Sequence, residues 1–370
     1  MKHNATLRRS ILLTLAMTAA FVLTACGAIA PPGWHALSAD DSQVYVSAGA
    51  SVVALDGTTG TPRWAFDTGA NQGSSSVATG LATNLYSPVE VTNNGDLVVT
   101  AYSQAIYGLS NTGQVIWGFD GNPDRDTIIT SEATLTDNNV YFASGNFLHA
   151  LDDVGNLEWS FESDEALWGG PLVTDTVIYQ PGMNHTMYAL DVNGAELWQS
   201  EALVGAVAST PALVDGVLVT GSLSKHIYGL DPDTGAILWD RETIGWPWAS
   251  PVDGGNGLVY MGDLDGGFYA ISAATGEVAW QIQLEGGIPS PPTLEDNILY
   301  VATGGGFLYS IDTADGAINW TAEPEPDFDD QLLASPVIFD SLVIVATTNG
   351  DQLVYAYQKS NGTPSWTYEG

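Results

Sequence analysis

The chain has 370 residues, of which 43 are acidic and eight are basic, so its formal net charge is −35 at pH 7. Such a surface repels nucleic acid and anionic lipid headgroups, which argues against nucleic acid as a partner. Its single cysteine excludes any disulfide within the chain. The acidic excess favours cationic ligands, although solubility in a salty habitat would explain it without any ligand.

Residues 1–25 have the features of a secretory signal peptide. Lys2, Arg8 and Arg9 precede the uncharged apolar run Ile11–Val22. That run is shorter than the about 20 residues needed to span a bilayer, and basic residues before a short apolar core are typical of an exported leader. The paired arginines partly resemble a twin-arginine signal, but the strongly apolar core favours general secretion.

The leader ends in Leu23-Thr24-Ala25-Cys26, which resembles the bacterial lipobox. The resemblance implies cleavage before Cys26 and acylation of both its thiol and its new amino group. Two or more acyl chains anchor a protein stably in a membrane. We therefore expect residues 26–33 to be a lipid-anchored tether in the cell envelope, on the outer face of the cytoplasmic membrane or on the outer membrane. The alternative is an ordinary signal peptide with a chance cysteine.

The rest of the chain repeats one unit of about 40 residues, and each copy ends in a tryptophan that follows a glycine by four residues. The tryptophans are Trp64, Trp117, Trp159, Trp198, Trp239, Trp280, Trp320 and Trp366. The glycines are Gly60, Gly113, Gly155, Gly194, Gly235, Gly276, Gly316 and Gly362. A unit repeated at this period must bury its apolar face against its neighbours.

Each copy is predicted to form four antiparallel strands. In the fifth copy, apolar and β-branched runs at 209–214, 217–221, 227–231 and 235–239 are separated by turn residues. The glycine of the last turn indicates a positive φ. The aspartate that precedes this glycine in five copies is expected to form an Asx turn; these residues are Asp56, Asp152, Asp191, Asp231 and Asp312.

The repeat tryptophan is expected early in the outermost strand, wedged between neighbouring sheets. Its truncation to alanine would cost about 3–5 kcal/mol if the indole is buried. The residue before the aliphatic position of the third strand is Ala, Gly or Ser, as in Ala189 and Gly229, which indicates a close neighbour there. Four-stranded units that close radially form a β-propeller. We therefore expect residues 34–370 to be an all-β, eight-bladed β-propeller in which the first and last blades meet directly.

The sequence Leu-Asp-x-x-Thr-Gly-x-x-x-Trp, found at Leu55–Trp64 and Leu230–Trp239, resembles the repeat of the pyrroloquinoline-quinone (PQQ) propellers in its tryptophan-docked form. The resemblance covers essentially all of residues 34–368. One branch of these proteins comprises quinoprotein dehydrogenases. Another is the lipid-anchored BamB type, a scaffold of the outer-membrane barrel-assembly machinery.

Membership of the dehydrogenase branch would imply PQQ held by calcium, a general-base aspartate, an arginine and often an adjacent-cysteine disulfide. This chain departs from that pattern, because its only cysteine is the expected lipid acceptor Cys26. The only arginines after the leader are Arg63, Arg125 and Arg241, and the longer gaps between repeats are confined to Gly69–Leu85 and Glu323–Asp330. We therefore expect no catalytic residue, no metal and no cofactor, and keep a PQQ-dependent dehydrogenase or quinone-binding sensor as the alternative.

Trp168, Trp246 and Trp248 lie outside the repeat positions and shortly before predicted innermost strands. Their loops are expected at one mouth of the central channel, where rigid aromatic side chains contact an extended peptide or a small ligand. Packing between blades is an equally good explanation. A propeller that binds a small ligand or carbohydrate is therefore a further alternative.

Three other features are interpreted as structural. His149, His185 and His226 have no metal-ligand spacing. Asp263–Gly267 superficially resembles part of a calcium loop but lacks the remaining ligands, so a hairpin turn is expected. The acidic stretch Glu323–Asp330 is read as a solvated loop, with a docking patch for a basic partner as the alternative.

The overall prediction is a non-enzymatic, membrane-anchored, extracytoplasmic scaffold that binds protein partners, with a barrel-assembly complex implied by the resemblance to BamB.

Overall fold

The computed structural model describes residues 35–68, 85, 87–102, 105–120, 129, 131–324, 331–348 and 351–370. Within this part of the chain the regular secondary structure consists of strands, and no helix is long and apolar enough to cross a membrane. The predicted signal peptide and tether, with Cys26, lie outside the described residues, as do Trp34, Arg125 and most of Gly69–Leu85 and of Glu323–Asp330.

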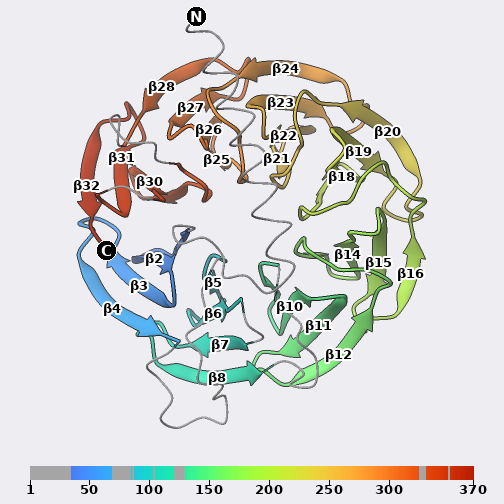
Figure 1. Ribbon diagram of the computed structural model, residues 1–370, viewed down its shortest axis with the longest axis horizontal. Helices are drawn as coiled ribbons and strands as arrows, with labels where there is room; N and C mark the ends of the chain where they lie inside the picture. The colour runs from blue at the N-terminus through green and yellow to red at the C-terminus, as the bar shows by residue number, and fades with distance from the viewer. Residues whose placement is uncertain are drawn as a thin grey trace, which may run out of the picture.

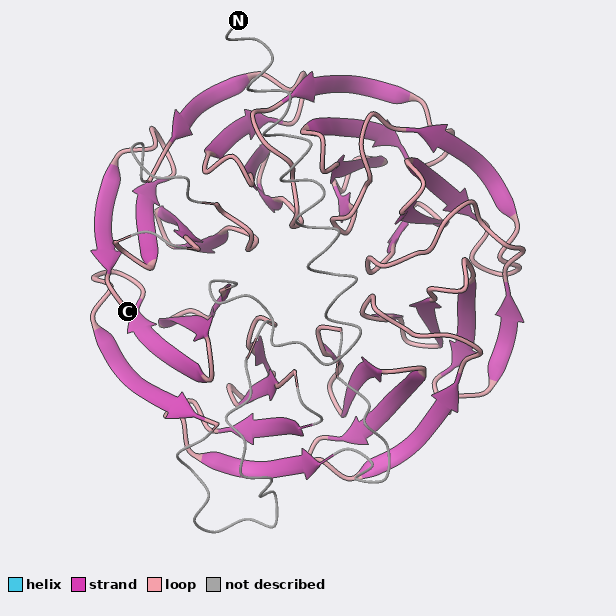
Figure 2. Ribbon diagram, viewed as in Figure 1, coloured by secondary structure: helices cyan, strands magenta, loops and turns pink. Residues whose placement is uncertain are grey.

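Eight four-stranded antiparallel sheets are arranged around a central axis, one sheet for each sequence repeat (Figure 1). In every blade the strands follow chain order from the centre to the rim, so the outermost strands form the circumference of the ring (Figure 2). The predicted all-β, eight-bladed propeller is therefore confirmed.

The strands are short throughout, and in each blade the innermost strand is the shortest. Blade one contains β1 (Ala36–Ala39), β2 (Gln43–Ala48), β3 (Ser51–Asp56) and β4 (Pro62–Asp67). Blade two contains β5 (Glu90–Val91), β6 (Leu97–Thr100), β7 (Ala105–Leu109) and β8 (Val115–Asp120). Blade three contains β9 (Thr134–Leu135), β10 (Asn139–Ser144), β11 (Phe147–Asp152) and β12 (Leu157–Glu162). Blade four contains β13 (Leu172–Val173), β14 (Val177–Pro181), β15 (Met187–Asp191) and β16 (Glu196–Gln199).

The second half of the ring repeats the same plan. Blade five contains β17 (Ala212–Val214), β18 (Val217–Ser222), β19 (His226–Leu230) and β20 (Ile237–Glu242). Blade six contains β21 (Val252–Asp253), β22 (Leu258–Gly262), β23 (Gly267–Ser272) and β24 (Val278–Gln283). Blade seven contains β25 (Thr293–Glu295), β26 (Ile298–Ala302), β27 (Leu308–Asp312) and β28 (Ile318–Ala322). Blade eight contains β29 (Val337–Phe339), β30 (Leu342–Ala346), β31 (Val354–Gln358) and β32 (Pro364–Tyr368).

Each repeat tryptophan contacts the last turn of the following blade. Trp239 of blade five donates its indole N–H to the carbonyl oxygen of Ala273 at 2.8 Å. Gly276 in that turn has a φ of +68°, and a Cβ added to it would lie 2.6 Å from Cε3 of Trp239. All eight turn glycines have positive φ, as predicted. Glycine is therefore required at this position for two reasons, the backbone conformation and the indole that lies against it.

The small residue in the third strand is explained by the tryptophan of its own blade. Gly229 on β19 is the cross-strand partner of Trp239, and a Cβ on Gly229 would lie 2.2 Å from the indole. The register then shifts by one residue at a β-bulge, and the same shift occurs beside the tryptophan of every other blade. The Asx turns are also confirmed, for example by Asp231, whose carboxylate accepts the backbone N–H groups of Asp233 and Thr234.

The repeat tryptophans are half-buried. The cost of about 3–5 kcal/mol expected for truncating a buried indole to alanine is therefore too high, because part of each ring stays in contact with water at the rim. A cost of about 2–3 kcal/mol for truncation is more consistent with this exposure.

The hydrophobic core is divided into eight clusters, each shared by two neighbouring blades. The cluster between blades eight and one closes the ring without a strand exchanged between them, with Val44 and Leu55 packed against Ile344 and Val354. Trp366 completes this contact by donating its indole N–H to the carbonyl of Gly57 at 3.1 Å. Closure at the seam therefore uses the same apolar packing and indole hydrogen bond as most of the other blade interfaces.

Candidate functional site

Three of the four non-repeat tryptophans lie in segments that cross from the outer strand of one blade to the inner strand of the next; the fourth, Trp34, lies outside the described residues. Trp168 lies between β12 and β13, whereas Trp246 and Trp248 lie between β20 and β21. All three side chains are half-buried. The predicted location in these crossing segments is confirmed, whereas contact with a ligand stays a prediction.

The segment 243–250 alternates strictly between buried and accessible residues. Thr243, Gly245, Pro247 and Ala249 are buried, whereas Ile244, Trp246, Trp248 and Ser250 are accessible to different degrees. The segment is not a regular strand, because the backbone bends at Ile244, Gly245 and Ala249, so the alternation describes the burial of the side chains alone. Ile244 is 48% exposed and lies farthest from the inner strand, whereas Ser250 lines the central cavity. We call Ile244, Trp246 and Trp248 the apolar stripe.

Packing between blades is carried out by the residue between the two tryptophans. A Cβ added to Gly221 of blade five would lie 2.6 Å from the carbonyl oxygen of Pro247 and 3.0 Å from its Cβ. Pro247 therefore fills the contact between blades five and six, while Trp246 and Trp248 are left half-accessible on either side of it. Packing between blades is thus shown for Pro247, whereas contact of Trp246 and Trp248 with a ligand stays a prediction.

A buried carboxylate holds the outer end of this segment in place. Asp263 is fully buried and accepts hydrogen bonds from the backbone N–H of Gly245 at 2.8 Å and from the Tyr269 hydroxyl at 2.7 Å. Tyr269 in turn accepts the backbone N–H of Ile244 at 2.9 Å. Burial, together with the neighbouring Asp263, raises the pKa of Tyr269, so the phenol remains a proton donor at neutral pH.

The same aspartate organises its own hairpin. Its Oδ1 atom accepts the backbone N–H groups of Asp265 at 2.9 Å and Gly267 at 2.8 Å. Both carboxylate oxygens are thus occupied by N–H and O–H donors, which supports the hairpin interpretation of Asp263–Gly267 over a calcium loop. Among the described residues no group of three or more potential metal ligands is present.

The segment that leads into blade five has a smaller counterpart of the apolar stripe. Val204 occupies the position equivalent to Ile244, is 60% exposed and donates its backbone N–H to the Tyr228 hydroxyl at 3.0 Å. Lys225 connects the two blades, because its Nζ atom donates to the Ile244 carbonyl at 2.6 Å and lies 3.6 Å from Oδ2 of Asp265. The apolar surface of blades five and six is therefore held together by direct polar contacts.

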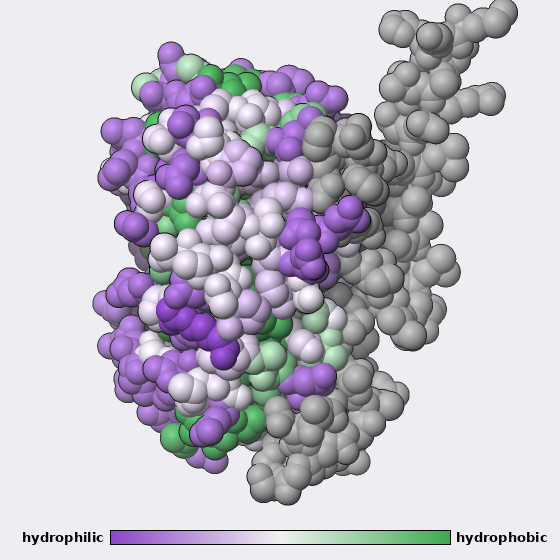
Figure 3. All heavy atoms as spheres, turned by 90° about the vertical axis from the view of Figure 1, so that its left-hand side faces the viewer, coloured by the Kyte–Doolittle hydropathy of each residue, from purple (hydrophilic) through white to green (hydrophobic). Residues whose placement is uncertain are grey.

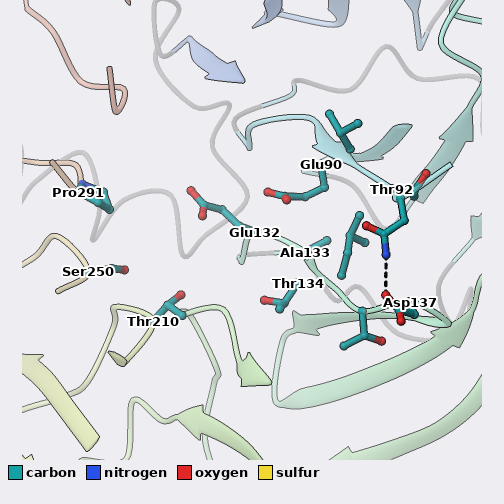
Figure 4. Close-up of a pocket in the computed structure, with 13 residues that line it drawn as sticks. Glu90, Thr92, Glu132, Ala133, Thr134, Asp137, Thr210, Ser250 and Pro291 are labelled. Atoms are coloured by element: carbon teal, nitrogen blue, oxygen red, sulfur yellow. Dashed lines mark hydrogen bonds between the residues drawn. The ribbon is translucent and has the colours of Figure 1, made fainter. Parts of the chain in front are cut away.

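A cavity of about 560 Å³ lies at the centre of the ring. The first strands of blades two and three form one side of it, and Thr210, Ser250 and Pro291 line it from blades five, six and seven. Glu90 on β5 and Glu132 just before β9 project into this space (Figure 4). The described lining residues that are ionisable are all acidic, namely Glu90, Glu132 and Asp137.

The two glutamates are in an environment that disfavours their charge. Desolvation by the surrounding ring raises the pKa of Glu90 to about 7, and the charge of Glu132 adds to this effect. Desolvation within the ring also raises the pKa of Glu132, whose side chain is exposed to the channel. The sequence analysis did not single out these residues. The signal that marks Glu132 is its position two residues before an innermost strand, where blades five and six have Thr210 and Ser250.

The histidines have local structural roles. His149 on β11 stacks on Phe147, lies near Ser160 with its Nδ1 atom 2.7 Å from the hydroxyl, and has its pKa lowered to about 4 by burial. His185 occupies a turn with a φ of +71°, and His226 is the first residue of β19 rather than part of the preceding turn. Its Nδ1 atom lies 3.5 Å from Oδ2 of Asp240.

The outer rim carries isolated apolar side chains rather than one patch. Figure 3 shows the side of the ring around β32, where hydrophilic residues are spread over the surface and apolar residues form small separate groups. On other blades single exposed residues occur on the outer strands, such as Ile116, Leu197 and Leu238. Scattered apolar residues of this kind are normal on a protein surface.

Comparison with known proteins gives a consistent result. The family model described as the outer membrane protein assembly factor BamB matches residues 27–144, 95–247 and 223–369. The computationally designed Ika8 protein superposes with a TM-score of 0.73 at 17% identity, over 89% of this chain and 97% of that protein. BamB from Moraxella catarrhalis superposes with a TM-score of 0.59 at 18% identity, over 78% of this chain and 83% of that protein. No curated protein sequence matches the chain.

Proposed function

Because the chain belongs to the BamB family of PQQ-like propellers, we propose that it is a non-enzymatic scaffold that binds protein partners in the assembly of outer-membrane barrels. The observation that carries this proposal is the match of the family model to nearly all of the chain after the leader. A fold alone does not fix a function. The proposal therefore depends on the family together with the accessible apolar stripe and the acidic surface.

The proposed location follows from the N-terminal sequence. The lipobox-like residues Leu23–Cys26 would attach the propeller to a membrane through acylated Cys26. The tether is short, so the ring would remain within roughly 25 Å of the bilayer at about 3.5 Å per residue. A scaffold held at that distance is well placed to contact a membrane-embedded assembly complex.

The central cavity is a poor site for PQQ. The quinone cofactor is a polycarboxylate, whereas the described ionisable residues that line the cavity are Glu90, Glu132 and Asp137. Like charges in a partly desolvated site repel each other strongly. Of the described arginines, Arg63 pairs with Asp56 on the rim of blade one and Arg241 donates to the Gly276 carbonyl between blades five and six. The residues present therefore do not fit this cofactor, and we propose no redox step.

The function is tested by deleting the gene and measuring the fraction of outer-membrane barrels that reach the folded, heat-modifiable form. The proposal predicts that the folded fraction falls and that the full chain restores it, whereas Cys26→Ser restores it less because the ring is released from the membrane. An unchanged folded fraction, combined with dye reduction after PQQ and calcium are added to the purified chain, would favour the dehydrogenase alternative.

A further inference from the structure

The outer edges of the eight blades differ in how well they are protected against pairing with another strand. Each outermost strand is hydrogen-bonded on its inner side and, among the described residues, has no strand on its outer side. Such an edge accepts a further strand unless charge, proline or short length prevents it. Charged residues occur in β4, β8, β12, β16 and β20, and β32 begins with Pro364. Of the eight outermost strands, all of which the structure describes, β24 and β28 have neither protection.

The edge of β24 is the more accessible of these two. β24 has six residues, of which Val278, Ala279, Gln281 and Gln283 are exposed, so that accessible side chains occur from one end to the other. β28 has five residues and ends in the buried Ala322. β24 lies on the circumference of the ring (Figure 1). Blade six therefore presents a full-length strand edge that carries no charge.

The two faces of β24 differ in polarity. Trp280 and Ile282 pack in the apolar cluster shared with blade seven, yet both remain half-buried. Gln281 and Gln283 lie on the opposite face of the same sheet and are exposed. A strand added beside β24 would continue both faces, so its apolar residues would lie next to the indole and its polar residues next to the glutamines. The edge therefore favours a segment in which apolar and polar residues alternate.

Charge decides between two possible occupants of this edge. A second copy of the chain could pair through its own β24, but each copy carries a formal charge of −35, so two copies repel each other. The exposed Glu277 directly before β24 adds a negative charge at the edge itself. A neutral or cationic segment of another protein meets no such repulsion. The occupant that fits is therefore a segment of a different protein without acidic side chains.

We propose that the outer edge of β24 adds a fifth strand to blade six, supplied by an extended, non-acidic segment of a partner protein in which apolar and polar residues alternate. Backbone hydrogen bonds would provide the affinity, and Trp280 and Ile282 would select the alternation. This proposal rests on the proposed scaffold function and names the chemistry of the client, because the strands of outer-membrane barrels alternate in this way.

The test uses the full chain in detergent and fluorescent peptides that are blocked at both ends and carry no charge, with affinity measured by fluorescence anisotropy. The first peptide alternates leucine with threonine. One control peptide has the same sequence with every backbone nitrogen methylated, and another has the same composition with the leucines and threonines in separate blocks. The proposal predicts saturable binding of the first peptide and binding at least about tenfold weaker for both controls.

Hydrogen exchange locates the bound peptide. A strand paired with β24 protects backbone N–H groups of that strand, so exchange across 278–283 should slow when the first peptide is added. The outermost strands of the other blades should exchange as they do without peptide. Protection that appears only in another blade, or in none, would overturn the proposal.

A charged variant of β24 tests whether the missing charge is what opens the edge. The double variant Ala279→Glu, Gln281→Asp gives β24 the kind of protection that other blades have. Glu158 directly precedes the repeat tryptophan in blade three, and Asp240 directly follows it in blade five, so both substitutions are compatible with the fold. We expect the variant to bind the first peptide about tenfold more weakly or less.

The matched control places the same charges on another blade. In blade four Leu197 and Gln199 flank the repeat tryptophan of β16. The double variant Leu197→Glu, Gln199→Asp changes the net charge by the same amount and should leave the affinity unchanged. Circular dichroism melting shows whether each variant is folded. A folded β24 variant that binds as tightly as the wild type would contradict the proposal.

Two other outcomes would also overturn it. Equal affinity of the methylated peptide would show that side chains alone hold the ligand, and binding that appears only after residues 27–33 are deleted would make the chain's own tether the occupant. Failure here is distinguishable from failure of the scaffold function. A charged β24 variant that restores barrel folding but ignores the peptides would show that the scaffold works without this edge.

Discussion

At the residue scale, the chain combines side chains that stabilise the ring with side chains that reduce its stability. Gly276 accommodates the Trp239 indole where any Cβ would clash. Glu90 and Glu132, by contrast, project carboxylates into a cavity whose surroundings raise the pKa of both. Groups that are unfavourable for folding are frequent at functional sites, because residues there are selected for binding and not for stability.

The first prediction concerns Glu132. A carboxyl group whose pKa is raised in the folded state destabilises the protein as pH rises above the pKa of the unfolded chain. Glu132→Gln should therefore raise the melting temperature at pH 8 and have almost no effect near pH 3, where the carboxyl group is protonated in both states. Differential scanning calorimetry at the two pH values measures this. A variant that is less stable than the wild type at pH 8, or equally affected at both pH values, would contradict the assignment, and Glu196→Gln on the outer strand β16 is the control.

The second prediction concerns His149, whose pKa is lowered to about 4 by burial. Because the unfolded imidazole has a pKa near 6.5, its contribution to stability is complete above that pH and is lost as pH falls toward 4. The other blades mostly have tyrosine at this position, as in Tyr188 and Tyr228. His149→Tyr should therefore lose less unfolding free energy than the wild type between pH 7 and pH 4.5, by about 1–3 kcal/mol. Urea titrations at both pH values test this, and identical losses would refute it.

At the scale of the element, the blade is a four-stranded sheet that its tryptophan fastens to its neighbour. The sequence was sufficient to predict the four strands, the positive φ of the turn glycine and the Asx turns, because each depends on local chemistry that recurs in every copy. The direction of the tryptophan contact could not be predicted. Trp239 contacts Ala273 and Gly276, which lie more than 30 residues later in the chain, and only the packing of the blades brings them together.

The third prediction tests that contact. Trp239→Ala removes the indole hydrogen bond and the packing on Gly276, so we expect a loss of about 2–3 kcal/mol in unfolding free energy. Leu238→Ala is a matched control, because the adjacent Leu238 is 51% exposed on the same strand and should change stability by less than about 0.5 kcal/mol. Chemical denaturation of both variants measures the difference. Equal effects would show that the indole does not fasten the blades.

At the scale of the whole molecule, the ring is closed by an interface that the chain does not cross. Seven interfaces join blades that follow each other in sequence, whereas blades eight and one meet only through side chains and backbone contacts at the seam. A connecting segment raises the effective concentration of the parts that it joins. The seam lacks this advantage and should open first.

The fourth prediction follows from this asymmetry. Trp366→Ala should increase hydrogen exchange in β2, β3, β30 and β31 more than Trp239→Ala increases it in blades five and six. Mass spectrometry of exchanged peptides resolves the two regions. A seam variant whose exchange stays at the wild-type level would mean that ring closure does not depend on the last tryptophan.

The site was less predictable than the fold. Trp168, Trp246 and Trp248 are visible in the sequence because they break the repeat, and their location before innermost strands is confirmed. The alternation that makes an apolar stripe, and the role of Pro247 in packing, required the three-dimensional structure. Glu90 and Glu132 face the same cavity from blades two and three, and the packing of these neighbouring blades brings them together.

Membrane anchoring of the propeller and its binding to the barrel-assembly machinery are tested together by affinity purification of the full lipidated chain from crosslinked membranes, followed by mass spectrometry. We expect a component of the barrel-assembly complex to be enriched with the wild-type chain and depleted with Cys26→Ser. Recovery of the chain without any such component would contradict the scaffold function, and recovery from the soluble fraction with Cys26 unacylated would contradict the membrane anchor.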